Sequence, residues 1–257
     1  DESHNDLGVQ SLAASIAPKS VTVTATDLSK SYGDADPELT ATVEGLSGDD
    51  TISYTLARVE GEDVGTYGIT VTGELEQGNY DVTYKNGILT VTQRALTLTA
   101  GSDTKVYDGY VLSNEEYTAE GLAEGDRILS VDHEGVQTDV GVSQNLVRNP
   151  KIVNASEADV TENYSVVCLT GTLEVTKKPI TITAESAEKV YDGTALKSSG
   201  YASTGLADGD VFDGLTVTGS QILAGEGSNI PSNAKIVRPA PTEDDPDHVV
   251  EVNDNYA

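Results

Sequence analysis

Several short stretches of this chain alternate between apolar and polar residues. Val21-Thr-Val-Thr-Ala-Thr26 alternates in this way, as do Leu96-Thr-Leu-Thr99 and Ile180-Thr-Ile-Thr183. Successive side chains of a β-strand point to opposite faces of a sheet, so each stretch predicts a strand with one apolar face. Turn sequences separate the stretches, and Asn86-Gly87 has the sequence of a tight hairpin loop. No helical period of useful length is present, and the chain is predicted to be all-β.

A set of sequence markers recurs three times in the same order. Lys-Val-Tyr-Asp-Gly occurs at 105–109 and at 189–193, and Lys30-Ser-Tyr-Gly-Asp34 is its earlier counterpart. Each copy also contains Gly-Leu followed by Asp, and each closes with Asn-Tyr. Such a repeat indicates that one supersecondary unit is used several times. We therefore divide the chain into a leader or linker segment and three repeats, with the bounds 1–20, 21–93, 94–178 and 179–257.

Each repeat has six or seven short strands within about 80 residues, which is typical of a small antiparallel Ig-like β-sandwich. The joins Gln93-Arg94-Ala95 and Lys177-Lys178-Pro179 are short and contain no flexible Gly/Ser coil. We therefore expect a tandem array that forms an elongated rod. Repeat 2 continues past its Asn-Tyr pair with a predicted hairpin, whereas repeat 3 stops at Ala257. Repeat 3 is thus predicted to be incomplete, so that the chain is a fragment or another segment fills the gap.

The marker residues also resemble a known family of repeats. Ser31-Tyr-Gly-Asp34 resembles the YGX-type MBG repeat, and the Val-Tyr-Asp-Gly of repeats 2 and 3 resembles the related YDG-type repeat. The resemblance covers about residues 21–257. It implies Ig-like modules of large bacterial surface and secreted proteins, and hence an extracellular, modular and non-catalytic protein. It does not identify a ligand.

Charge and composition exclude several function classes. The chain has 43 acidic and 15 basic residues and a net charge of −28, which would repel nucleic acid and anionic membranes. No apolar run approaches the ~18 residues of a membrane helix, so no membrane insertion is expected here. The single cysteine, Cys168, excludes an internal disulfide and is expected to be a buried, inert thiol. No paired acid and base, activated nucleophile or phosphate loop is found, so we predict neither an enzyme nor a bound cofactor.

Six recurring tyrosines are predicted to be structural. An Asn-Tyr pair near an acidic or glycine residue suggests a tyrosine corner, in which the ring packs in the core and the hydroxyl bonds to nearby backbone. Besides the tyrosine of the Asn-Tyr pair, every repeat has a tyrosine two positions after a lysine. The tyrosines in question are Tyr80, Tyr164, Tyr256, Tyr32, Tyr107 and Tyr191.

Two further patterns suggest chemistry, and each also has a simpler interpretation. Asp208, Asp210 and Asp213 provide the oxygen ligands that calcium prefers, although Asp beside Gly also suits an ordinary turn. The lysines before the repeated tyrosines, together with the asparagines of the Asn-Tyr pairs, suggest intramolecular amide crosslinks. The alternative is that these lysines only cover apolar surface with their stems.

Our leading functional hypothesis is a stalk or adhesin region of a bacterial cell-surface protein. Such a region would be extracellular, monomeric and attached to the cell surface or cell wall through regions outside this chain. A host protein such as mucin or an immunoglobulin is a candidate partner. Tyr54, Tyr110, Arg238 and His248 are the candidate contact residues, because aromatic residues and arginine are enriched in interface centres. The alternative is an accessory carbohydrate-binding module of a secreted glycosidase with a glycan ligand, although tryptophan is absent.

Overall fold

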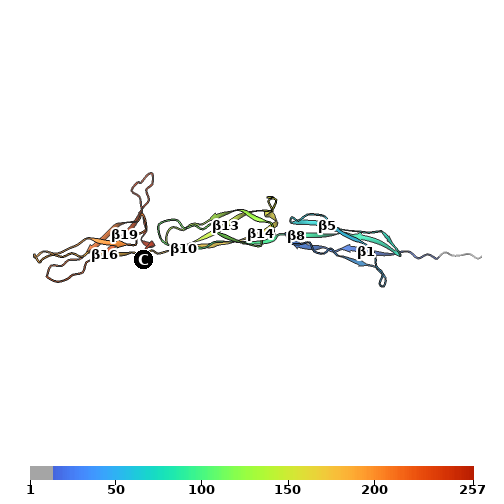
Figure 1. Ribbon diagram of the computed structural model, residues 1–257, viewed down its shortest axis with the longest axis horizontal. Helices are drawn as coiled ribbons and strands as arrows, with labels where there is room; N and C mark the ends of the chain where they lie inside the picture. Colours follow the sequence, from blue (N-terminus) through green and yellow to red (C-terminus); the bar gives the residue numbers. More distant parts are fainter. Residues whose placement is uncertain (1–13) are drawn as a thin grey trace, which may run out of the picture. The chain divides into compact units, whose positions relative to one another are not determined.

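The computed structural model describes residues 14–257, and its regular structure is almost entirely β-strand (Figure 1). Within these residues there are two short 3-10 helices and no α-helix, and neither 3-10 helix is long or apolar enough to cross a membrane. The all-β prediction is therefore confirmed. Of the predicted leader, residues 1–13 lie outside the described residues, and the first strand already begins at Lys19.

The contacts between residues divide the chain into two compact units. Among the described residues, unit 1 comprises 14–95, 122–127 and 152–165, and unit 2 comprises 96–121, 128–151 and 166–257. The borders of these units fall inside repeat 2, so the division into three repeats stays a prediction.

Unit 1 contains two four-stranded sheets that share one core. One sheet has the order β3-β1-β7-β6 and the other the order β2-β8-β5-β4. The strands are β1 (Lys19–Ala25), β2 (Leu28–Ser31), β3 (Ala41–Glu44), β4 (Thr55–Arg58), β5 (Gly65–Thr72), β6 (Glu76–Gln77), β7 (Tyr80–Lys85) and β8 (Gly87–Thr92). Because the strands alternate with period two, Val23 and Val82 of the first sheet meet Ile69 and Leu89 of the second sheet in a single apolar cluster.

The connection between β7 and β8 differs from the predicted hairpin. These two strands lie in different sheets, and the chain crosses from one sheet to the other at Asn86. A side chain at Gly87 would lie 2.8 Å from the carbonyl oxygen of Ala25, so the glycine permits a close approach to β1. The Asn-Gly pair therefore serves a crossover and not a two-residue loop. The hairpin predicted after Tyr164 is wrong for the same reason.

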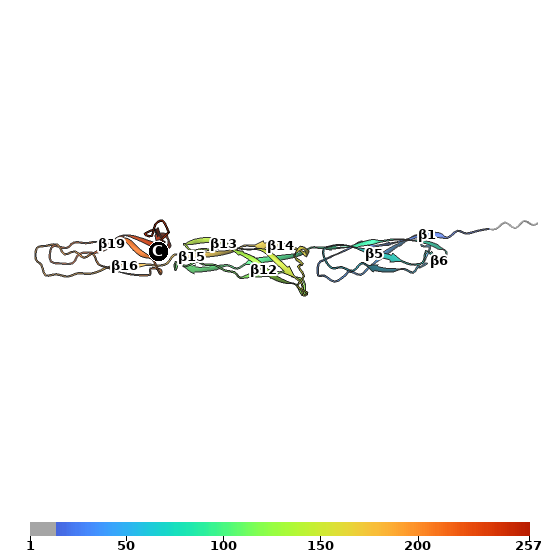
Figure 2. The same ribbon diagram turned by 90° about the horizontal axis from the view of Figure 1, so that it is seen from above.

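Unit 2 contains four sheets, with strand orders β10-β15-β13-β12, β11-β9-β14, β16-β17 and β18-β19-β20. Among its strands, β12, β16 and β19 are labelled in Figure 2. The strands are β9 (Arg94–Ala100), β10 (Asp103–Val106), β11 (Tyr117–Glu120), β12 (Arg127–Glu134), β13 (Gly141–Val153), β14 (Tyr164–Leu169), β15 (Gly171–Thr176), β16 (Thr181–Ala184), β17 (Tyr201–Thr204), β18 (Val211–Thr218), β19 (Ile230–Pro239) and β20 (Val249–Glu251). The two 3-10 helices are η1 (Thr161–Asn163) and η2 (Asn253–Asn255). Each helix directly precedes the tyrosine of an Asn-Tyr pair.

The sheets are mixed, which corrects the antiparallel prediction. β1 pairs with β7, β2 with β8 and β10 with β15 in parallel. The first and last strands of a repeat run in the same direction when the chain enters a repeat at one end and leaves at the other. An alternating pattern predicts which face of a strand is buried but not the direction of its neighbour.

Cys168 also differs from its predicted environment, because it is exposed. It shares a face of β14 with Tyr164, which is buried, and with Val166, which is half-buried. Burial therefore decreases along this face of the strand. The alternating pattern alone does not show at which residue the face becomes exposed to solvent.

Candidate functional site

Tyr32 and Tyr107, the tyrosines that follow a lysine in repeats 1 and 2, lie where one repeat meets the next. Tyr32 follows β2 and donates its backbone N–H to the carbonyl of Thr92, 2.9 Å away. Tyr107 follows β10 and donates in the same way to Thr176 at 2.8 Å. In both cases the last strand of the repeat holds the backbone of the tyrosine, and its ring packs against a tyrosine of the next repeat.

The first junction consists of Tyr32, Asp63, Asp126, Asn163 and Tyr164, all within unit 1. The rings of Tyr32 and Tyr164 meet edge to face, with centroids 5.5 Å apart. The hydroxyl of Tyr164 donates to the Asp126 carboxylate at 2.6 Å and accepts the backbone N–H of Ala123 at 3.0 Å. Repeat 2 therefore forms a socket, with Asp126 and Tyr164 fixed in place, and the ring of Tyr32 packs into it.

An asparagine clasp completes the first junction. The side-chain amide of Asn163 donates to the Asp63 carboxylate at 2.7 Å, and its oxygen accepts the backbone N–H of Val64 at 2.9 Å. Asn163 is buried, so both ends of its side chain are satisfied by the preceding repeat. Asn163 thus binds repeat 1, while the adjacent Tyr164 packs against the ring of Tyr32.

The second junction repeats this geometry within unit 2, with Tyr107, Asp139, Asp210, Asn255 and Tyr256. The two tyrosine rings meet edge to face at 5.6 Å. Tyr256 donates its hydroxyl to Asp210 at 2.5 Å, and Tyr107 donates to the same carboxylate at 3.2 Å. Asn255 donates to Asp139 at 2.8 Å and accepts the backbone N–H of Val140 at 2.7 Å. The edge-to-face tyrosine pair, the hydrogen bond from the second tyrosine to an aspartate and the asparagine contacts therefore occur at both junctions.

The second junction has an additional arginine, Arg238. Its Nε donates to the buried Asp210 carboxylate at 2.7 Å, and its guanidinium lies 5.5 Å from the centroid of the Tyr107 ring. It also donates to the backbone carbonyls of Gly109 and Asp208. A guanidinium that pairs with a carboxylate and stacks on an aromatic face combines two attractive interactions.

The junctions keep their tyrosines protonated. Burial raises the pKa of Tyr32 to about 12, and the Asp126 carboxylate acts in the same direction. Burial and the hydrogen bond to a carboxylate raise the pKa of Tyr164 and of Tyr256 well above the usual range. Burial also raises the pKa of Tyr107. A hydroxyl that donates to a buried carboxylate cannot lose its proton without placing two negative charges side by side.

The equivalent groups at the two ends of the chain are uncovered. In repeat 1, Tyr80 donates to Asp50 at 2.5 Å, but Asp50 and Asn79 are exposed. In repeat 3, Tyr191 is 63% exposed, whereas Tyr107 is fully buried. Five of the six tyrosines predicted to be structural are therefore buried, and Tyr191 is not.

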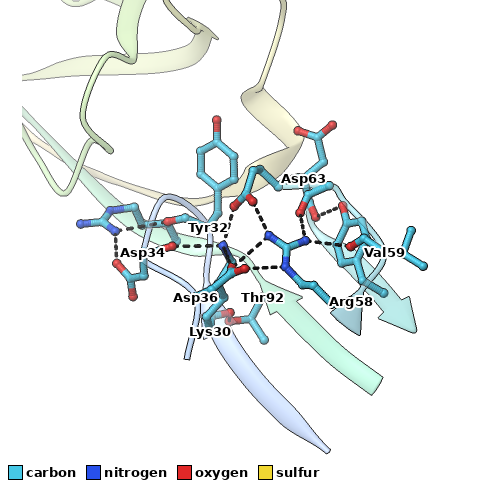
Figure 3. Close-up of polar contacts among 12 residues, drawn as sticks. Lys30, Tyr32, Asp34, Asp36, Arg58, Val59, Asp63 and Thr92 are labelled. Carbon is cyan, nitrogen blue, oxygen red and sulfur yellow. Dashed lines mark hydrogen bonds and ion pairs between the residues drawn. The ribbon is translucent and has the colours of Figure 1, made fainter. Parts of the chain in front are cut away.

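Repeat 1 also contains an ion network around Lys30, beside the first junction (Figure 3). Lys30 is buried and pairs with Asp36 at 2.7 Å and with Glu62, and Arg58 pairs with the same two carboxylates. Burial alone would lower the pKa of Lys30, but the hydrogen bonds to both carboxylates outweigh it and raise the pKa. Tyr32 points away from this network (Figure 3).

The lysines of the three repeats thus have partners that differ from those expected for an amide crosslink. Lys105 contacts Asp108, and Lys189 contacts Asp192. In the part of the chain that the structure describes, the contacts of these lysines are with carboxylates, hydroxyls and carbonyls. The amide crosslink therefore stays a hypothesis that the contacts do not favour.

The three candidate calcium ligands have separate partners. Asp210 belongs to the second junction, Asp208 accepts the hydroxyl of Tyr110 at 2.7 Å, and Asp213 pairs with Lys235 at 2.6 Å. Among residues 14–257 no group of three or more His, Cys, Asp and Glu side chains is placed to hold a metal ion. Calcium binding stays an untested prediction.

The candidate contact residues are dispersed. Tyr110 and Arg238 both lie at the second junction. Tyr54 packs against the core of unit 1, and His248 lies on an exposed loop, 3.7 Å from Asp245. The structure thus brings Tyr110, Arg238, Asp208 and Asp210 together, although the patterns that selected them were unrelated.

The aspartates that accept a hydrogen bond from the clasp asparagines were not predicted from the sequence. Asp63-Val-Gly65 and Asp139-Val-Gly141 occupy equivalent positions, and both bind the asparagine of the following repeat. The corresponding residues of repeat 3 are Leu223-Ala-Gly225, which have no carboxylate. This recurring Asp-Val-Gly motif was the available signal.

Comparison with known proteins supports part of the predicted resemblance. A search of the curated proteins gave no match. Residues 21–90 match the MBG domain family (YGX type), which confirms the resemblance predicted from Ser31-Tyr-Gly-Asp34 for repeat 1. This match indicates a domain of the kind found in bacterial surface proteins.

Proposed function

We propose that this chain is a non-catalytic spacer of a bacterial cell-surface protein, built from tandem Ig-like sandwiches that form an elongated, semi-rigid rod. The observation that carries the proposal is the duplicated junction. Tyr32 and Tyr107 each enter a socket of the following repeat, and Asn163 and Asn255 each clasp the preceding repeat. Two contacts at each join restrict the angle between repeats far more than a flexible linker would.

The charge of the chain supports an extracellular, soluble role. A net charge of −28 keeps copies of a protein apart and disfavours association with nucleic acid or anionic membranes. The family match of repeat 1 is consistent with a surface location. We infer that the rod holds a binding region at a distance from the cell envelope.

A host protein remains our proposed partner, and the loop 240–248 is the proposed contact. This loop lies in an insertion that repeat 2 lacks, and it exposes His248 and the acidic run Glu243–Asp247. An array of mucins, immunoglobulins and glycans, probed with the full chain and with a variant in which residues 241–247 are replaced by Gly-Ser, tests this. Glycan binding that survives the replacement would favour the carbohydrate-binding alternative.

Small-angle X-ray scattering tests the spacer. Three repeats joined end to end should give a maximum dimension of about 110 Å at ~3.3 Å per strand residue. The double variant Tyr32→Ala, Tyr107→Ala should give a broader distribution of dimensions, because the sockets are then empty. A compact particle for the unaltered chain would contradict the proposal.

A further inference from the structure

The turn that follows the buried tyrosine differs between the two junctions. Repeat 1 has the order Tyr32-Gly-Asp34, whereas repeat 2 has the order Tyr107-Asp-Gly109. The residues in the left-handed region are Gly33, with φ of +78°, and Gly109, with φ of +87°. Glycine adopts this backbone without strain, and in repeat 2 it lies one position later than in repeat 1. The two turns therefore present different surfaces to the repeat that follows.

At the first junction the turn is bound by Arg94, the first residue of β9. Its guanidinium donates to the backbone carbonyl of Tyr32 at 3.2 Å and pairs with the Asp34 carboxylate at 2.8 Å. The residues at the same positions of the second junction are Lys178 and Gly109. Because Gly109 has no carboxylate, this ion pair is possible only in the first junction.

At the second junction the turn is bound by Arg238, which comes from β19. Its guanidinium donates to the backbone carbonyl of Gly109, and a side chain at Gly109 would overlap the guanidinium. The counterpart of Arg238 in repeat 2 is Asn154, which also follows Lys-Ile-Val. The side-chain oxygen of Asn154 accepts the backbone N–H groups of Ser156 and Ala158 in its own loop. The first junction thus has no arginine at the position that binds the turn of the second.

Each turn fits only one of the two arginine positions. If the order in repeat 1 became Tyr-Asp-Gly, the side chain at position 33 would begin 2.5 Å from Cβ of Ala123, and Arg94 would lose its carboxylate. If the order in repeat 2 became Tyr-Gly-Asp, the side chain at position 109 would collide with Arg238. Carbon atoms pack at about 3.5–4.0 Å, so either exchange would force the next repeat away from the turn.

We propose that the turn of one repeat and an arginine of the next form a matched pair, which determines which repeats can follow one another. The order Tyr-Gly-Asp requires an arginine at the position of Arg94, and the order Tyr-Asp-Gly requires one at the position of Arg238. The proposal rests on the spacer function, because it assumes that the repeats dock through their tyrosines. It adds specificity, since a matched pair gains charge-assisted hydrogen bonds and an unmatched pair suffers a collision or a lost ion pair.

The width of the distance distribution between repeats 2 and 3 measures how well the second junction holds. Spin labels on E120C and S199C, in a C168S background, give this distribution by double electron–electron resonance on the full chain. Both labelled positions are exposed and are not members of the matched pair. The labels therefore report docking without altering the residues under test.

An exchange of residues at the second junction tests the proposal. D108G with G109D gives repeat 2 the turn of repeat 1, and K178R with R238N gives repeat 3 the corresponding residues of repeat 2. We expect each pair of substitutions alone to broaden the distribution, and all four together to restore the width found in the unaltered chain. Because the variant with four substitutions contains the same exchanged turn, its recovery would exclude loss of folding as the cause of the broadening.

The same exchange in repeat 3, D192G with G193D, is the matched control. Within residues 14–257 nothing lies within 4 Å of a side chain at Gly193, so the distribution should stay narrow. A narrow distribution after the turn exchange in repeat 2 alone would overturn the matched pair and leave the spacer function standing. So would a variant with four substitutions that is as broad as the turn exchange alone. A broad distribution in the unaltered chain would contradict the spacer function and the matched pair together.

Discussion

Tyr107 and Tyr191 lie in the same pentapeptide, Lys-Val-Tyr-Asp-Gly, but their surroundings differ completely. Tyr107 is fully buried, held by Thr176 and packed against Tyr256. Tyr191 is 63% exposed, and within residues 14–257 no strand equivalent to β15 lies beside it and no second tyrosine packs against its ring. The pentapeptide thus places a tyrosine shortly before a bend, whereas the last strand and the next repeat decide whether that tyrosine is buried.

The largest expected effect comes from truncating these two tyrosines. Tyr107→Ala should lower the free energy of unfolding by about 3–5 kcal/mol, because it removes a fully buried ring and leaves a cavity. Tyr191→Ala should change it by no more than about 0.5 kcal/mol, as expected for an exposed side chain. Urea denaturation of both variants measures the difference. Equal effects would show that the pentapeptide acts within its own repeat and not through the junction.

Gly33 and Gly193 provide a second comparison between a position at a junction and an exposed one. Gly33 and Gly193 both have φ of +78°, so alanine brings the same backbone strain to both. A side chain at Gly33 would lie 2.5 Å from Cβ of Ala123, whereas nothing lies within 4 Å of one at Gly193. Gly33→Ala should therefore destabilise by about 1–3 kcal/mol more than Gly193→Ala. Matching urea midpoints would contradict the close approach of repeat 2 to this turn.

Asp210 and Asp213 of repeat 3 allow a buried junction carboxylate to be compared with an exposed ion pair. Asp210→Asn should cost about 1–3 kcal/mol, because the buried carboxylate accepts from Tyr107, Tyr256 and Arg238. Asp213→Asn should cost at most about 1 kcal/mol, because its pair with Lys235 is exposed. Thermal unfolding of the two variants tests this. A larger loss of stability for Asp213→Asn than for Asp210→Asn would contradict the stabilising role of the junction carboxylate.

The smallest expected effect is a loss of stability in alkali. The pKa of Tyr32 is raised from 10.0 to about 12, so the folded state holds a proton that the unfolded state releases. This contribution is complete below pH 10 and is lost as the pH rises toward 12. The free energy of unfolding should therefore fall between pH 10 and 11, and fall less in Tyr32→Phe. A stability that stays constant in both proteins would contradict the buried state of this hydroxyl.

Much of the fold could be predicted from sequence, because buried strands alternate visibly and the markers recur. Val21, Val23 and the tyrosines of the Asn-Tyr pairs are buried as their positions suggest. Strand direction could not be predicted, because the same alternation suits the parallel pair β1–β7 and an antiparallel one. Asn86-Gly87 was misleading because a glycine also serves where two strands approach closely.

The site was only partly predictable. Recurrence singled out Tyr32, Tyr107 and the Asn-Tyr pairs, but spacing along a chain does not show which repeat a side chain contacts. The clasp joins Asp63 to Asn163 across 100 residues, and Arg238 of β19 reaches the carbonyl of Gly109 across 129 residues. Such contacts depend on how one repeat is placed against the next, which no local pattern determines.

In our proposal, the tyrosine in its socket fixes one repeat against the next. Spin labels on E120C and S199C in a C168S background measure this by double electron–electron resonance. These positions are exposed and lie in repeats 2 and 3. We expect a narrow distance distribution that broadens when Tyr107→Ala is added and stays narrow with Tyr191→Ala. Equally narrow distributions in all three proteins, or a broad one in the protein that retains both tyrosines, would contradict it.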